Sequence, residues 1–199
     1  MVNLKNCTHW IFDMDGTLTV AVHDFEAIRA ELGLPPKKPI LESIATLPDN
    51  EAKRVNQRLH EIEEALANEA RPQPGANALL QTLQDRGIPM GILTRNNEPN
   101  ADITLKACNL WEFFEPACIL GRESATPKPD PSGIHKLLSY WQISPNQAVM
   151  VGDHRMDLIA GRRAGTTTVH MNAVDNGYWP DEADVTVKSL EELLDYLVS

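Results

Sequence analysis

The sequence predicts an α/β fold, in which a parallel sheet is covered by helices on both faces and a helical insertion separates the first two strands. The first observation is a series of short, almost continuously apolar runs, which are typical of buried parallel strands. These runs cover 9–12, 90–93, 117–120, 148–151 and 167–171. The second observation is that segments with a helical period lie between such runs. The third is segment 20–73, which carries helical signals only.

The core helices are predicted from apolar spacing and from residues typical of helix ends. Apolar residues at helical spacing predict helices at 76–83 and 134–141, with Gly87 and Gly165 placed for left-handed C-terminal caps. Asp130 is expected as an N-cap, with Pro131 at the first helical position. Ser189 begins a capping box, so the chain is expected to end in a helix. This alternation favours right-handed crossovers between parallel strands.

The insertion is expected to hold a helix at 24–32, a proline-rich loop at 34–39 and a longer helix at 49–69. On the longer helix, Val55, Leu59, Ile62 and Leu66 share one face and charges cover the other. We interpret this apolar stripe as packing surface within the insertion rather than as a partner-binding face. The sequence therefore predicts a core domain formed by 1–19 and 74–199 and a helical domain formed by 20–73.

Composition narrows the classes of partner and compartment. A formal charge of −10 argues against nucleic acid as a partner, but a local site with a cation can still bind a small anion. No apolar run approaches the roughly 20 residues that span a bilayer, and the N-terminus does not resemble a signal peptide. The three cysteines, Cys7, Cys108 and Cys118, have no metal-ligand spacing and are expected to be reduced thiols. We expect a cytoplasmic protein with no membrane partner; no oligomeric state follows from the sequence.

Asp13 and Asp15 follow the first predicted strand, at the edge where parallel sheets bind ligands. Two carboxylates two residues apart can surround one reacting centre, one as nucleophile and the other as acid and base. Gly16 permits a sharp turn there. An acidic turn without chemistry would have the same sequence. An EF-hand loop is excluded, because the glycine stands at the fourth loop position instead of the sixth.

Two further segments suit a phosphate group. Thr94, Arg95 and Asn96 follow the second strand, where a hydroxyl and successive backbone N–H groups can hold phosphate oxygens. A helix N-cap is the alternative interpretation of this segment. Lys128 lies between two prolines that restrict the backbone and can aim its ammonium group. A solvated loop lysine is the alternative there.

Asp153 and Asp157 follow the fourth predicted strand and open a helix. Carboxylates four residues apart on a helix can face the same side and suit a hard cation that prefers oxygen ligands. Acidic residues are also favoured at a helix N-terminus without any metal. These two interpretations remain open from the spacing alone.

Taken in order, these segments resemble the four-motif signature of the haloacid dehalogenase-like hydrolases, and the resemblance covers most of the chain. The motifs are Asp13-Met14-Asp15-Gly16-Thr17-Leu18, then Thr94, then Lys128, then Gly152-Asp153 with Asp157. The 128–131 and 183–194 segments are similar to the phosphoglycolate phosphatase-like branch, which carries a small helical cap between the first two motifs. The resemblance implies a Rossmann-like core with 20–73 as the cap, and a Mg²⁺-dependent phosphatase.

The resemblance also implies a role for each motif. Asp13 attacks phosphorus to give an aspartyl-phosphate, and Asp15 protonates the leaving alkoxide and later deprotonates water. Mg²⁺ is held by the Asp13 carboxylate, the Asp15 backbone carbonyl and Asp153. Asp157 orients Lys128 or supports the metal without binding it directly. The residues expected to contact the substrate are Asp13, Met14, Asp15, Thr94, Arg95, Asn96 and Lys128, among which Thr94 and Lys128 hold the phosphoryl oxygens during catalysis.

Specificity is expected to come from the cap, with His23, Asp24 and Arg71 as candidates. Arg71 could meet a substrate carboxylate, although a surface arginine at a helix end is the simpler interpretation. By resemblance the first choice of substrate is 2-phosphoglycolate, with other small phosphate monoesters as further candidates. Two other functions stay open. One is a phosphomutase on the same scaffold, and the other is a catalytically silent module that binds phosphate esters.

Overall fold

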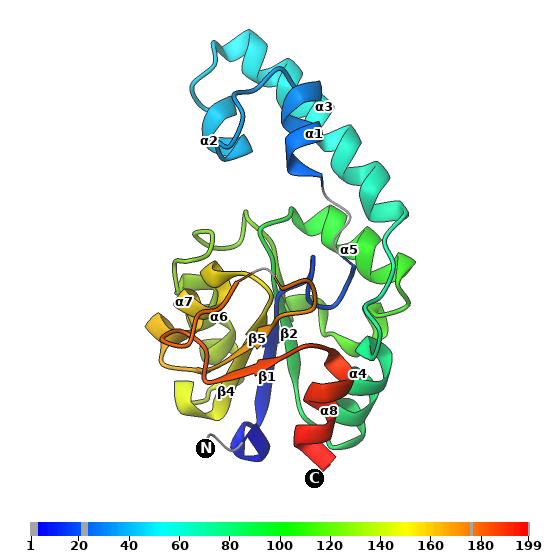
Figure 1. The fold of residues 1–199 in the computed structure, drawn as a ribbon, viewed down its shortest axis with the longest axis vertical. Coiled ribbons are helices and arrows are strands. Elements are labelled where there is room, and N and C mark those ends of the chain that lie inside the picture. The colour runs from blue at the N-terminus through cyan, green and yellow to red at the C-terminus, as the bar shows by residue number, and fades with distance from the viewer. Residues whose placement is uncertain (1–3, 21–23, 176, 199) are drawn as a thin grey trace.

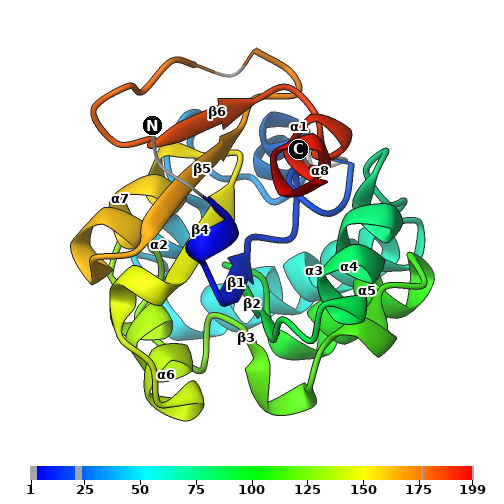
Figure 2. The ribbon, with the colours of Figure 1, turned by 90° about the horizontal axis from the view of Figure 1, so that it is seen from below.

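The core is a six-stranded parallel sheet with helices on both faces, seen in a computed structural model that describes residues 4–20, 24–175 and 177–198. The strands lie in the order β3-β2-β1-β4-β5-β6, which places β1 next to the point where the strand order reverses (Figure 2). Every pair of neighbours is parallel. The strands are β1 His9–Phe12, β2 Met90–Leu93, β3 Ile119–Leu120, β4 Ala148–Gly152, β5 Thr167–Met171 and β6 Val185–Val187.

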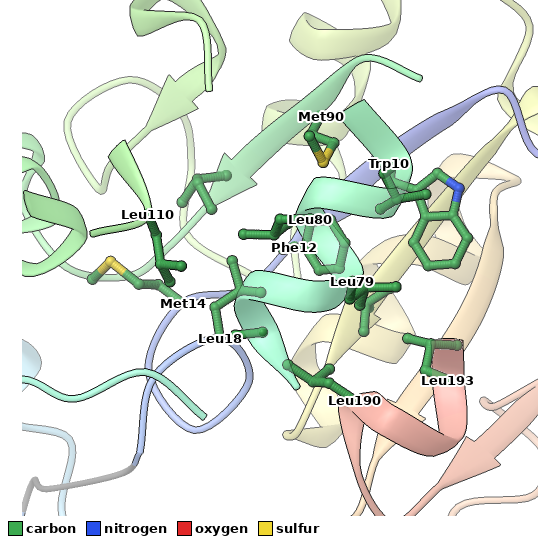
Figure 3. Packing of buried hydrophobic residues seen from close by; sticks show 14 of the residues in the cluster. Trp10, Phe12, Met14, Leu18, Leu79, Leu80, Met90, Leu110, Leu190 and Leu193 are labelled. Atoms are coloured by element: carbon green, nitrogen blue, oxygen red, sulfur yellow. The ribbon is translucent and has the colours of Figure 1, made fainter. Parts of the chain in front are cut away.

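Helices cover the two faces of the sheet, as Figure 2 shows. On one face lie α4 Ala76–Asp85, α5 Glu98–Ala107 and α8 Leu190–Val198, and on the other lie α6 Ser132–Trp141 and α7 Arg155–Ala164. The side chains of β1 alternate between these two layers. Trp10 and Phe12 pack with Leu79 and Leu80 in one apolar cluster (Figure 3), whereas Ile11 belongs to the cluster on the opposite face. Burial on both faces explains why the strands read as continuous apolar runs.

The insertion consists of α1 Phe25–Glu31, α2 Ile40–Ile44 and α3 Asp49–Asn68, and it lies beyond one end of the strands, above the sheet in Figure 1. It has an apolar cluster of its own, in which Val55 and Leu59 are buried and Ile62 and Leu66 are partly buried. The predicted stripe therefore packs within the insertion, as expected. The five-residue α2 was not predicted, since it is too short to show a helical period.

Most predicted strands are confirmed, but the run at 117–120 is only partly a strand. Pro116–Cys118 forms a short 3-10 helix, because Pro116 has no N–H for a sheet and fits the first position of such a turn. Strand β3 begins only at Ile119. Strand β6 was not predicted; it has three residues and leaves Thr186 exposed. Three other short 3-10 helices are Leu4–Asn6, Trp111–Phe113 and Pro145–Gln147.

The predicted helix ends agree with the structure except at α6. Gly87 and Gly165 adopt left-handed backbone angles, φ +66° and +80°, as predicted. At α6 the N-cap is Pro131 rather than Asp130, although the Asp130 carboxylate accepts a hydrogen bond of 2.9 Å from the Ser132 N–H. The prediction was one residue too early, because Asp130 precedes the N-cap position although its carboxylate accepts from the first residue of the helix.

Two further findings concern the helices and the cysteines. None of the helices in the described residues is long and apolar enough to cross a membrane. The three cysteines are buried and form no disulfide, as predicted.

Candidate active site

The loop after β1 turns tightly and presents Asp13 at the edge of the sheet. The Asp13 N–H donates to the Val151 carbonyl of β4 at 2.9 Å, which fixes its backbone. The Met14 carbonyl accepts hydrogen bonds from Leu18 and Thr19, at 2.9 and 3.0 Å. The Met14 side chain points into the apolar cluster of the core (Figure 3). Only the Met14 backbone is therefore free to face a ligand.

Two glycines of the motifs allow a close approach to carboxylates. Gly16 has φ +91°, and a Cβ atom there would lie 2.4 Å from Asp153 Oδ2. At Gly152 a Cβ atom would lie 2.3 Å from the Cβ atom of Asp157. A side chain at either position would displace an aspartate, so the glycines are needed for the acidic cluster as well as for the turn.

Lys128 lies between two of the predicted carboxylates. Its Nζ is 2.5 Å from Asp13 Oδ1 and 2.6 Å from Asp157 Oδ1, and its side chain is buried. Asp157 Oδ2 also accepts a hydrogen bond of 3.0 Å from the His154 N–H at the start of α7. Asp157 therefore holds Lys128 and caps a helix at the same time. The interpretation of Lys128 as a solvated loop residue was wrong.

Thr17 links the first and fourth motifs. Its Oγ1 lies 3.3 Å from Asp13 Oδ2 and 3.4 Å from Asp153 Oδ1, within hydrogen-bond distance of both. The Thr17 side chain is fully buried, so this hydroxyl helps to fix the two carboxylates relative to each other. Sequence reasoning did not single out this role of Thr17.

The electrostatics of the cluster favour an added positive charge. Burial raises the pKa of Asp13 well above its usual range, with the carboxylates of Asp157 and Asp153 adding to the shift and Lys128 opposing it. Burial and the charge of Asp157 raise the pKa of Asp153 to about 6. Burial alone would lower the pKa of Lys128, but the charges of Asp13 and Asp157 outweigh it and raise that pKa. Lys128 is therefore a fixed cation, in contact with two of the three carboxylates.

The donor set fits a hard divalent cation. Asp13, Asp153 and Asp157 each offer an oxygen atom, and these atoms lie within 4.8 Å of one another. Carboxylate oxygens are the ligands that Mg²⁺ and Ca²⁺ prefer. Both oxygen atoms of Asp157 contact protein donors, Lys128 Nζ and the His154 N–H, and both oxygen atoms of Asp13 likewise lie near Lys128 Nζ and the Thr17 hydroxyl.

The segment after β2 has a hydroxyl at the same edge of the sheet. The Thr94 N–H donates to the Leu120 carbonyl at 3.0 Å, and its Oγ1 accepts from the Asn96 N–H at 3.0 Å. Both side chains are buried. The N-cap of α5 is Asn97, whose side chain accepts from the Asn100 N–H at 2.8 Å. Neither Thr94 nor Asn96 is thus the cap that the alternative interpretation required.

These segments line one cavity of about 280 Å³. Its walls include the predicted residues Asp13, Asp15, Thr94, Arg95, Asn96, Lys128, Asp153 and Asp157. They also include four residues that sequence reasoning missed, namely Phe25, Glu63, His154 and Met156. His154 and Met156 could have been found as neighbours of Asp153. Phe25 and Glu63 come from α1 and α3 of the insertion, and no local pattern marks them.

The three specificity candidates lie away from this cavity or outside the described residues. His23 is outside the described residues. Asp24 is exposed and caps α1, accepting from the N–H groups of Glu26 and Ala27 at 3.1 and 3.0 Å. Arg71 is exposed, and its carbonyl accepts from the Val20 N–H at 2.9 Å. Neither Asp24 nor Arg71 lines the cavity that holds Asp13.

Known proteins share both the sequence pattern and the fold. A family model described as haloacid dehalogenase-like hydrolase matches residues 10–171. An uncharacterized hydrolase of Saccharomyces cerevisiae is 33% identical over 98% of this chain and 92% of its own. A phosphoglycolate phosphatase of Neisseria meningitidis is 30% identical over 91% of this chain and 84% of its own. The crystal structure of a hydrolase from Pseudomonas syringae is 26% identical, with a TM-score of 0.78 over 96% of this chain and 98% of that one.

Proposed function

The chain belongs to the haloacid dehalogenase-like hydrolases, and from this premise we propose that it is a Mg²⁺-dependent phosphatase of a small phosphate monoester that works through an aspartyl-phosphate on Asp13. One observation carries the proposal. The buried Asp13 carboxylate is held 2.5 Å from the Lys128 ammonium group, in a cavity that also contains Asp15, Thr94 and Asp153. A nucleophile, an acid and base, and groups for an anion thus share one site.

In the proposed first step, an Asp13 oxygen forms a bond to phosphorus and the bond from phosphorus to the ester oxygen breaks. Asp15, partly exposed on the cavity wall, gives its proton to the departing alkoxide. In the second step, Asp15 takes a proton from water, whose oxygen attacks phosphorus and releases inorganic phosphate from Asp13. Lys128 and Thr17 hold the Asp13 carboxylate in place through both steps.

Asp13 and Asp153 would hold Mg²⁺ through their carboxylates, together with the Asp15 backbone carbonyl, while Asp157 supports the site through Lys128. The bound ion supplies the positive charge that lets an anionic carboxylate approach an anionic phosphate.

The cavity wall also offers donors for the phosphoryl oxygens. We propose that they are held by the Thr94 hydroxyl, the Lys128 ammonium group and the backbone N–H groups of Met14, Asp15 and Arg95, in the loops after β1 and β2. The Asn96 N–H donates to Thr94 Oγ1 and so positions that hydroxyl. Fixed donors of this kind stabilise charge that develops in a transition state without reorganising.

We propose that residues 1–19 and 74–199 form the catalytic core and that residues 20–73 form a cap. Phe25 and Glu63 support this division, because these insertion residues lie on the wall of a cavity whose chemistry comes from the core. The cap would exclude water during the first step and select the ester. Three buried thiols without a disulfide favour a reducing compartment, which supports a cytoplasmic enzyme.

2-Phosphoglycolate is the first substrate to test, because a relative is named for it. Other relatives are named for larger esters: a validoxylamine A 7′-phosphate phosphatase of Streptomyces hygroscopicus and an N-acetylmuramic acid 6-phosphate phosphatase of Pseudomonas aeruginosa, 27% and 28% identical. A panel of small phosphate monoesters is therefore the appropriate assay.

The decisive experiment measures phosphate release from p-nitrophenyl phosphate with Mg²⁺, with EDTA and for Asp13→Asn, which we expect to lose all but a trace of activity. Asp85→Asn, an exposed aspartate at the end of α4, is the control and should behave as wild type. No turnover of any ester by folded, Mg²⁺-supplied protein would contradict the phosphatase. Conversion of a sugar 1-phosphate primed by glucose 1,6-bisphosphate would indicate a phosphomutase instead.

A further inference from the structure

A second cavity, of about 360 Å³, adjoins the cavity that holds Asp13. The two share Phe25, Glu63 and Arg95 in their walls, so they are neighbouring compartments of one space. The second compartment, here called the cap pocket, is formed by the 37–42 segment, α1 and α3 of the insertion together with Arg95 and Arg122 of the core. A phosphate ester bound at Asp13 therefore has a defined place for its leaving group.

The cap pocket differs in charge from the catalytic cavity. Five cations and two carboxylates line it: Arg29, Lys37, Lys38, Arg95, Arg122, Glu42 and Glu63. Two of the cations are already neutralised. Arg29 pairs with Glu26 at 2.8 Å, and Arg122 pairs with Glu63 at 3.1 Å.

Three cations of the cap pocket remain for a ligand. Arg95 is 42% exposed at its side chain and lies 3.8 Å from Glu42, the longest of the ion pairs seen in the described residues. Lys37 and Lys38 are exposed, and neither ammonium group has a side-chain partner in the part of the chain that the structure describes. An excess of positive charge at this place is notable in a protein with a formal charge of −10.

We propose that the cap pocket binds the leaving group of the substrate and selects one that carries a second anionic group, either a carboxylate or a second phosphate. This inference rests on the proposed phosphatase function. Lys37, Lys38 and Arg95 supply the attraction, and the apolar side chains of Ile28 and Leu59 face the carbon skeleton. In the proposed site Lys128 of the catalytic cavity already holds the phosphoryl group, so a second anionic group needs the cations of the cap pocket.

The test compares esters that differ only in the distal group. 3-Phosphoglycerate and glycerol 3-phosphate share a three-carbon chain but carry a carboxylate and a hydroxymethyl group. Fructose 1,6-bisphosphate and fructose 6-phosphate differ by a second phosphate, so the two pairs distinguish the two sources of anionic charge. We expect kcat/KM to be about tenfold higher for the anionic member of at least one pair, as one charge-assisted contact provides.

Variants identify the residues responsible. In Lys37→Gln with Lys38→Gln, the ratio of kcat/KM between the anionic and neutral esters should fall severalfold, mainly through a higher KM for the anionic ester. The control is Lys53→Gln, an exposed lysine of α3 outside both cavities, which should leave this ratio unchanged. Raising NaCl should reduce the ratio in wild type, because exposed charges are screened.

The same experiments distinguish a wrong inference about the cap pocket from a wrong assignment of phosphatase activity. Equal kcat/KM within each pair, in an enzyme that does release phosphate, would overturn the proposed selectivity of the cap pocket. The proposed phosphatase activity would still stand. Binding of each ester to Asp13→Asn, measured by calorimetry with Mg²⁺, needs no turnover and should show the same preference. Equal affinities there would overturn the inference independently of any activity.

Discussion

The close approach of the carboxylates around Asp13 depends on the residues that surround them. The carboxylates of Asp13, Asp153 and Asp157 lie close together because two glycines leave room for them and because Lys128 stands between two of them. Burial raises the pKa of Asp13 and of Asp153, and the charge of Asp157 raises both further, so the cluster is costly until a cation joins it. Residues that look like turn formers in the sequence therefore belong to the site.

Gly16→Ala tests this requirement. The new Cβ atom would lie 2.4 Å from Asp153 Oδ2, so we expect Asp153 to move and the Mg²⁺ concentration for half-maximal activity to rise at least tenfold. Gly33→Ala is the matched control. Gly33 also has a left-handed backbone, φ +68°, but a Cβ atom there meets nothing within 4 Å. Both variants should lose about 1 kcal/mol of unfolding free energy from backbone strain, and only Gly16→Ala should lose Mg²⁺ affinity. Unchanged Mg²⁺ dependence in Gly16→Ala would refute the argument.

Elements with strong local patterns were predictable from the sequence, and elements defined by tertiary contacts were not. The strand β1 and the helix α4 have continuous or periodic apolar residues that any neighbour would bury. Helix α5 was missed because Asn100 and Thr104 occupy part of its buried face, which hides the apolar period. Three of the four motifs were found because they adjoin strand ends, and Lys128 was found because prolines flank it. Phe25 and Glu63 were missed because only folding brings the insertion to the cavity.

Helix α3 is fastened to the core through Glu63. Its carboxylate accepts from Arg122 Nη1 at 3.1 Å and Nη2 at 3.3 Å, and from Asn97 Nδ2 at 3.3 Å. The side chains of Glu63 and Arg122 are only 13% and 20% exposed. An ion pair held by several hydrogen bonds and partly shielded from water contributes more than an exposed pair.

We expect Glu63→Gln to loosen the cap, because a neutral amide replaces the carboxylate that Arg122 and Asn97 contact. Amide hydrogen exchange in the C-terminal half of α3 should accelerate about tenfold, equivalent to about 1.4 kcal/mol of opening free energy. Glu61→Gln is the control on the same helix: Glu61 pairs with Arg58 at 2.8 Å, but both side chains are about half exposed. Loss of the pair between Glu61 and Arg58 should change amide hydrogen exchange in α3 little. Equal acceleration in the two variants would show that Glu63 does not fasten the cap.

At the scale of the whole molecule, the order of the strands gathers distant segments into one site. The loops after β1, β2 and β4, which are neighbours in the sheet, bring together Asp13, Thr94 and Asp153. The sheet is parallel, so all these loops emerge at the same edge. The molecule therefore concentrates carboxylates at one place, in a chain that already carries a formal charge of −10.

This concentration of charge makes the stability of the metal-free protein depend on pH. The pKa of Asp153 is about 6 in the folded protein, against 3.8 as its ordinary value. The folded state thus binds a proton between these pH values that the unfolded state does not. The contribution of Asp153 to the unfolding free energy is therefore expected to rise by about 1–2 kcal/mol as pH falls from 7.5 towards 4. The same contribution is lost as pH rises through 6.

Mg²⁺ should reverse this trend, because a protonated carboxylate cannot bind the ion. Stabilisation by saturating Mg²⁺ is expected to be largest at pH 7.5 and to shrink as pH falls below about 6, where Asp153 takes up its proton. Asp153→Asn removes the charge without changing the size of the side chain. At pH 7.5 in EDTA this variant should melt at a higher temperature than wild type, and Mg²⁺ should stabilise it little. Thermal melts between pH 5.5 and 8, with EDTA or Mg²⁺, measure both effects, and the difference between variant and wild type removes the contribution of the other acidic groups. If Mg²⁺ stabilises wild type equally at pH 5.5 and 7.5, Asp153 is not a ligand whose charge the ion requires.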